Sequence, residues 1–68
     1  MSFIKQLEKK VIGKINAIEN ANTKEDGIKI IKEANLNEKI NRLGEYDEAL
    51  GLELLTRYHE AVTSNSKK

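Results

Sequence analysis

The side chains that could do chemistry in this 68-residue chain are few. His59 is the only histidine, and the chain has no cysteine. Without cysteine, one histidine cannot complete the usual zinc-ligand sets, and a catalytic base also needs a nucleophile or polarising partner in a pocket. The carboxylates of Glu45, Asp47 and Glu48 are explained by the start of a helix, where the dipole favours negative charge. We therefore predict no enzymatic activity, no metal or organic cofactor and no small-molecule substrate.

Residues 22–33 resemble the calcium-binding loop of the EF-hand family at two positions. Gly27 falls at the sixth position of such a loop and Glu33 at the twelfth. Lys24 departs from the family because it places a cation at the third position, where a calcium ligand belongs. Thr23 is explained without calcium as the N-cap of a helix. The sequence therefore favours a helix start over a calcium site.

The segment 27–43 has the outline of a helix-turn-helix, with two short helices about a three-residue turn. Its second helix would present Lys39, Asn41 and Arg42, and asparagine and arginine are side chains that read base edges. Glu38 would approach the phosphates as well, and the net charge of the chain is only +1. DNA-binding domains usually carry a clear positive patch. A small DNA-binding regulator is therefore the alternative function, with nucleic acid as the less favoured partner.

Apolar residues at helical spacing must position all of these side chains. The first helix is expected to begin after an N-cap at Ser2 and to end near Asn20. Its apolar stripe, with intervals of three and four residues, consists of Ile4, Leu7, Val11, Ile15 and Ile18. This period is that of an amphipathic helix, which must bury its stripe against something.

Three further helical elements follow along the chain. A second helix is expected over about 24–34, then a short third element that ends at Gly44, because glycine commonly stops a helix. A fourth helix is expected over about 46–62. In an alternative, the third and fourth elements are one helix through Gly44, and Gly44 and Gly51 share a face that admits a crossing helix. The sequence leaves both arrangements open.

The charges predict which helices pack together. Residues 1–18 hold four lysines against one glutamate, a balance of +3, and residues 45–62 hold five acidic residues against one arginine, a balance of −4. This asymmetry favours packing the first helix against the last. We predict an all-α domain over residues 1–62, a small bundle of three main helices plus a short connecting helical turn. Residues 63–68 are expected to be a flexible polar tail.

Size and composition shape the expected function. A chain this short cannot hide all of its apolar residues, so we expect self-association, most simply as a homodimer. The leading function is a small non-enzymatic protein-binding module, an inhibitor or adaptor, that presents a helix face to a partner. Aromatic and arginine side chains most often anchor interfaces, so the candidate contact residues are Phe3, Arg42, Tyr46 and Arg57.

The composition also predicts where the protein acts. No apolar run approaches the length of a membrane span, and the N-terminus lacks the apolar core of a signal peptide. We therefore expect a cytoplasmic protein with no membrane partner. The abundance of lysine, asparagine and isoleucine is typical of an AT-rich genome, bacterial or phage, so a phage-encoded inhibitor or adaptor is one of the origins that the composition allows.

Overall fold

Four helices account for nearly all of the chain. The computed structural model describes residues 3–68, so the N-cap expected at Ser2 lies outside the described residues. The helices are α1 (Phe3–Glu19), α2 (Lys24–Ala34), α3 (Leu36–Tyr46) and α4 (Glu48–Ser66). Together they form a compact all-α globule with a radius of gyration of 11.8 Å.

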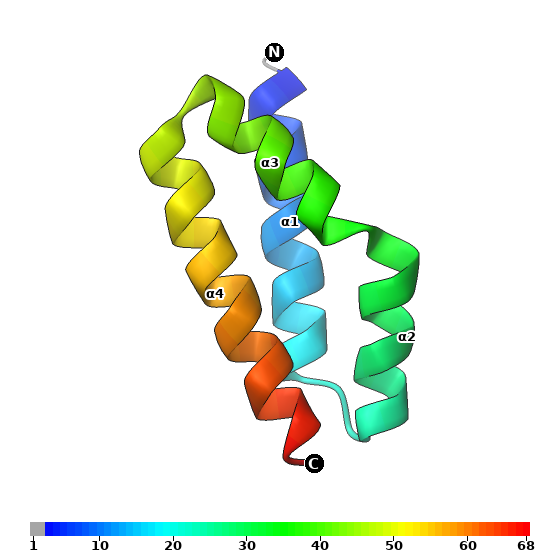
Figure 1. Cartoon of the computed structure of the whole chain (residues 1–68). Coiled ribbons are helices and arrows are strands. Elements are labelled where there is room, and N and C mark those ends of the chain that lie inside the picture. The colour runs from blue at the N-terminus through cyan, green and yellow to red at the C-terminus, as the bar shows by residue number, and fades with distance from the viewer. Residues whose placement is uncertain (1–2) are drawn as a thin grey trace.

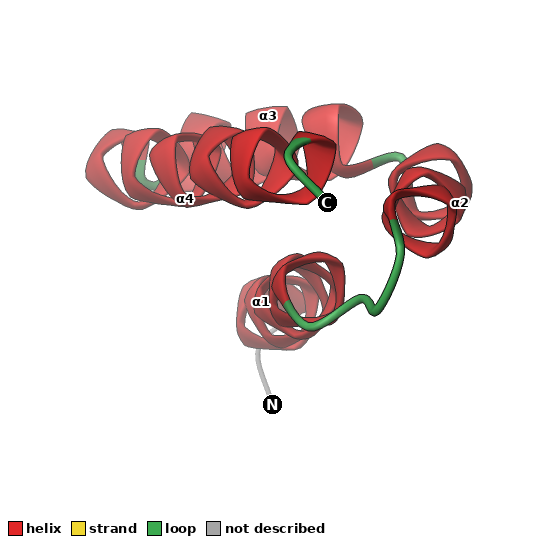
Figure 2. Ribbon diagram, turned by 90° about the horizontal axis from the view of Figure 1, so that it is seen from below, coloured by secondary structure: helices red, strands yellow, loops and turns green. Residues whose placement is uncertain are grey.

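Helix α1 contacts each of the other three helices. In Figure 1, α1 and α4 run in the same direction, α2 returns along the other side of α1, and α3 crosses the first half of α1. The view from below shows α2, α3 and α4 arching over α1 (Figure 2). The predicted contact between the first and last helices is confirmed, and α1 is the element on which the others assemble.

The core consists largely of the predicted apolar stripe and the residues that cover it. Val11, Ile15 and Ile18 of α1 are completely buried. Their partners from the later helices are Ala34, Leu36, Ile40, Leu43, Leu54, Tyr58 and Ala61. Burying such side chains contributes about 1.5–3 kcal/mol each for the larger ones, so this contact holds the globule together.

The third element is longer than we predicted. Helix α3 has 11 residues, as many as α2, so the bundle has four helices instead of three and a connecting turn. Gly44 does not stop it. The break falls at Asp47, which has an extended backbone. Its N–H donates to Leu43 O at 2.9 Å, and its carboxylate accepts from the N–H of Leu50 at 3.2 Å. Asp47 therefore ends α3 and caps α4, and the alternative of one continuous helix is wrong at this residue.

Gly44 and Gly51 let α3 and α4 approach closely on either side of the Asp47 turn. A Cβ atom added to Gly51 would lie 2.5 Å from the Cα atom of Gly44, closer than real side chains come to backbone. The two glycines therefore face each other from two separate helices, and do not share a face of one continuous helix as the sequence alternative held. Their small size lets α3 and α4 cross closely, whereas the alternative had them admit another helix against a single continuous helix.

Single residues also define the other two helix junctions. Thr23 caps α2 as predicted, because its hydroxyl accepts from the N–H of Asp26 at 3.1 Å. Asn35 alone separates α2 from α3, with a left-handed backbone (φ 49°, ψ 53°). Asparagine adopts this conformation more readily than most residues. The expected three-residue turn of a helix-turn-helix is therefore reduced to one residue.

The polar tail expected at residues 63–68 is helical as far as Ser66. The cause is Asn65, which is only 2% exposed and whose Nδ2 donates to Lys24 O at 3.1 Å. Gly27 makes room for this side chain, since a Cβ atom there would lie 2.1 Å from Asn65 Oδ1. A polar side chain thus fixes the end of α4 to the start of α2, which an apolar pattern could not predict.

Candidate functional site

The histidine and the acidic cluster lie in different parts of the described structure. His59 is exposed on α4, where its ring lies 6.0 Å from that of Tyr58, and Glu60 and Lys67 are among the residues around it. Within residues 3–68, no three histidine, aspartate or glutamate side chains are arranged to hold a metal ion. The acidic cluster Glu45, Asp47 and Glu48 lies at the α3–α4 junction, where Asp47 caps a helix.

The segment that resembles a calcium loop is folded as a helix. Residues 24–33 all belong to α2, and Gly27 is buried within that helix instead of lying in a turn. A calcium loop needs its backbone and carboxylates wrapped around one point. This segment instead spreads its side chains around a helix axis, so the sequence likeness has no structural counterpart.

The candidate contact residues Phe3 and Arg42 lie in one depression of the surface. It has a volume of about 280 Å³, and it lies between the start of α1 and helix α3, with Lys10 and Lys39 also in its lining. Phe3 is 60% exposed. An apolar ring and an arginine in one hollow between two helices are the combination that most often anchors a partner.

The remaining two candidates occupy different places. Tyr46 is 72% exposed and follows Arg42 by one helical turn, so the two side chains are neighbours on the surface of α3. Arg57 is half-buried on α4, and its Nη2 donates to Asn16 Oδ1 of α1 at 3.3 Å. Three of the four candidates are therefore near the α1–α3 junction, and Arg57 serves the α1–α4 contact.

A second depression continues the first along α1. Its volume is about 450 Å³, and Lys10 and Lys39 line both depressions. The second depression is also lined by Gly13, Lys14 and Ala17 of α1. Four cations and one carboxylate, Glu38, line the two hollows together. We define the basic–aromatic surface as the exposed residues Phe3, Lys10, Lys14 and Arg42 of these hollows, the half-buried Lys39 and the exposed Tyr46, which follows Arg42 by one helical turn.

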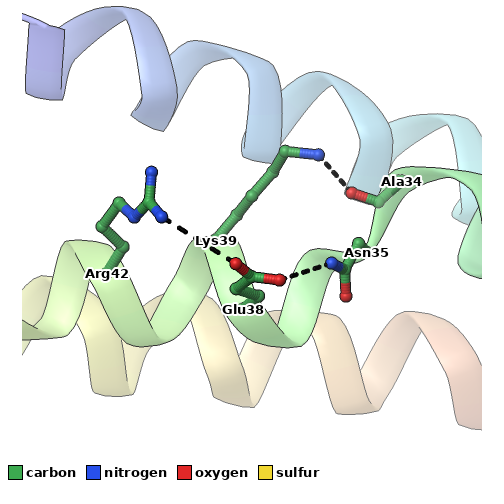
Figure 3. Close-up of polar contacts among 5 residues, drawn as sticks. All are labelled: Ala34, Asn35, Glu38, Lys39 and Arg42. Carbon is green, nitrogen blue, oxygen red and sulfur yellow. Dashed lines mark hydrogen bonds and ion pairs between the residues drawn. The ribbon is translucent and has the colours of Figure 1, made fainter.

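Figure 3 shows how the polar side chains of α3 are held within this surface. Asn35 Nδ2 donates to Glu38 Oε2 at 2.7 Å, and Arg42 Nη2 lies 3.8 Å from Glu38 Oε1. The side chain of Lys39 reaches toward α1, and its ammonium group donates a hydrogen bond to Ala34 O at the end of α2. The Arg42–Glu38 pair is largely exposed, and such pairs contribute about 0–1 kcal/mol. Arg42 can therefore exchange Glu38 for another anion at little cost.

The three residues of the DNA-binding alternative do not share one face. Lys39 and Arg42 belong to the depression beside α1. Asn41 lies on the other flank of α3, in a groove against α4. A recognition helix in the major groove needs its base-reading side chains on one side, so this arrangement does not support reading of bases by all three.

The sequence reasoning missed two parts of the molecular surface. Lys10 and Lys14 join the basic–aromatic surface only because α3 lies beside them. Leu52 is 60% exposed in a groove between α3 and α4, out of phase with the buried stripe of α4. That mismatch of phase was a signal available in the sequence, because Leu52 stands two positions before the core residue Leu54.

Comparison with known proteins identifies no relative from which a function could be inferred. No protein-family model, curated protein or solved structure matches the chain. Among residues 3–68, no helix combines the length and apolar character that a bilayer crossing requires.

Proposed function

We propose that this protein is a small non-enzymatic binding module, an inhibitor or adaptor, that holds an acidic segment of another protein on its basic–aromatic surface. The observation that carries the proposal is the shared depression of Phe3, Arg42, Lys10 and Lys39. The exposed ring offers an apolar anchor, and the cations around it select a partner with negative charge.

The energetics of this surface favour a partner that is both acidic and apolar. Covering the exposed part of the Phe3 ring contributes roughly 1–2 kcal/mol at ordinary burial coefficients. Arg42 gains a bidentate partner if a carboxylate replaces the distant oxygen of Glu38. Lys10 and Lys14 add long-range attraction that raises the association rate more than the affinity. An amphipathic helix with a glutamate-rich edge combines these features.

Single-stranded nucleic acid is a second candidate for the same surface. Its support is the cluster of Lys10, Lys14 and Lys39 around one depression, with the exposed aromatic rings of Phe3 and Tyr46 nearby. Bases stack on aromatic side chains while lysines follow the phosphates. The lining carboxylate Glu38 counts against it, since it would repel phosphate.

The experiment titrates the isotopically labelled protein with two probes of equal length. One is a synthetic amphipathic helix with leucines on one face and glutamates at its edges, and the other is a single-stranded oligothymidine. We expect the peptide to shift the amide signals of Lys10, Lys39 and Arg42. Binding of the oligonucleotide alone, with affinity that falls steeply as salt rises, would favour the second candidate.

Two matched pairs of variants test which surface binds. Phe3→Ala should weaken peptide binding, while Leu52→Ala should not, although both side chains are 60% exposed. Arg42→Gln should weaken binding and Arg57→Gln should not, because Arg57 faces Asn16 instead. Equal effects within each pair, or no binding of either probe, would refute the proposal.

A further inference from the structure

A groove between α3 and α4 is a second surface, separate from the basic–aromatic one. It has a volume of about 250 Å³ and is lined only by α3 and α4 residues, with Gly44 and Gly51 beside Glu45, Glu48 and Leu52. Both glycines line the groove, and their close contact sets how near the two helix backbones lie. Its exposed lining residues are Asn41, the two glutamates and the leucine, so it suits an apolar segment that carries positive charge.

The outer face of α1 has the complementary chemistry. Lys5, Lys9 and Ile12 line a depression of about 360 Å³ on α1, and none of them lines the basic–aromatic surface. Lys5 and Lys9 are one helical turn apart, so their side chains are neighbours on one face. This face therefore presents two ammonium groups in a row, with the half-buried side chains of Glu8 and Ile12 next to them.

We propose that the outer face of α1 in one copy docks in the α3–α4 groove of a second copy. Lys5 and Lys9 would meet Glu45 and Glu48, while Ile12 would cover the exposed Leu52. The groove carries the carboxylates of Glu45 and Glu48, while the α1 face carries Lys5 and Lys9 against one carboxylate, Glu8, so the opposite net charges of the two surfaces support this occupant.

The contact joins two different surfaces, so it is heterologous. Each copy offers one groove and one α1 face, and association therefore continues from copy to copy or closes into a ring or a reciprocal pair. The contact uses no residue of the basic–aromatic surface. The contact is independent of the proposed function, and either one can fail without the other.

Charge reversal with exchange of partners tests the contact. The groove variant is Glu45→Lys with Glu48→Lys, and the α1 variant is Lys5→Glu with Lys9→Glu. Association is measured by analytical ultracentrifugation at low salt with interference detection, because a chain with no tryptophan and only two tyrosines absorbs little ultraviolet light. We expect the natural protein to associate at micromolar concentration and each variant alone to remain monomeric. An equimolar mixture of the two variants should associate again, since each restores the charge pattern that the other lacks.

Two controls separate this contact from a general effect of charge. Lys29→Glu with Lys32→Glu reverses exposed lysines of α2, and Glu53→Lys with Glu60→Lys reverses exposed glutamates of α4 outside the groove. Both should associate like the natural protein, and thermal unfolding checks that all variants are folded. In addition, the amide signals of Gly44 and Gly51 should shift with protein concentration, while that of Gly27, buried against Asn65, should not.

Three results would overturn the proposal. The first is a natural protein that stays monomeric at every accessible concentration. The second is association that the groove and α1 variants retain, which would place the contact elsewhere. The third is a mixture of folded variants that stays monomeric, because complementary charges would then not be what joins the copies.

Discussion

Replacing Gly51 by alanine tests the close crossing of α3 and α4. The added methyl carbon would lie 2.5 Å from the Cα atom of Gly44 and 3.0 Å from its nitrogen. An ordinary carbon contact is about 3.5–4.0 Å, so the helices must separate by roughly 1 Å. Neither atom belongs to a side chain that could rotate away. Overpacking of this kind costs about 1–3 kcal/mol, and contact with backbone places Gly51→Ala near the upper end.

Helix propensity acts in the opposite direction and must be subtracted. Alanine is favoured over glycine inside a helix by about 1 kcal/mol. The net loss for Gly51→Ala is then about 2 kcal/mol, which corresponds to a fall in melting temperature of roughly 8–16 °C for a domain of this size. Gly13→Ala isolates the propensity effect, since nothing lies within 4 Å of a Cβ atom there. That variant should melt about 4–8 °C higher than the natural protein.

The assay is thermal unfolding followed by far-ultraviolet circular dichroism, in dilute solution so that association does not add to stability. The same substitution is expected to lower stability at Gly51 and to raise it at Gly13. Gly44→Ala provides an intermediate case, because its Cβ atom would make an ordinary contact of 3.7 Å. A Gly51→Ala protein as stable as the natural one would show that α3 and α4 do not touch at this point.

Four further predictions concern single side chains. Gly27→Ala should cost about 1–3 kcal/mol because its Cβ would overlap the Asn65 amide, and adding Asn65→Ala should recover part of that loss in urea unfolding; no recovery would place the strain elsewhere. Ile15→Asp should abolish the helical circular dichroism signal, since a buried unpaired charge costs several kcal/mol; an unchanged melting temperature would remove Ile15 from the core. Asp47→Ala should cost about 0.5–2 kcal/mol by loss of the α4 cap, while Asp47→Asn should retain most of it. His59→Gln should leave both the fold and probe binding intact, and a folded variant that loses binding would reopen a role for this residue.

Local patterns in the sequence predicted the helices because each helix depends on neighbouring residues. The stripe from Leu7 to Ile18 has a period that only a helix satisfies, and Thr23 marks a helix start through its own hydroxyl. Such features involve side chains within four residues of each other. The all-α class, most helix positions and the contact of α1 with α4 could therefore be predicted without tertiary information.

Helix ends were predicted less well where the deciding contact is distant in sequence. Gly44 has the local character of a helix stop, yet α3 continues through it to Tyr46, and the backbone of Gly44 packs against Gly51 of α4. Residues 63–66 have the composition of a frayed end, but they remain helical because Asn65 meets Gly27 and Lys24. In both places a contact between separate helices outweighs local propensity.

The amino-acid sequence by itself determined that this protein is helical, which residues of α1 turn inward, and that its two ends carry opposite charge. These properties follow from side-chain spacing and composition, which the linear chain already contains. Only the tertiary structure decided that Phe3 shares a depression with Arg42, that Asn41 faces away from Lys39, and that Gly44 and Gly51 line one groove together with two glutamates. The reason is physical: a surface is formed by residues from different helices, and its composition depends on how those helices cross.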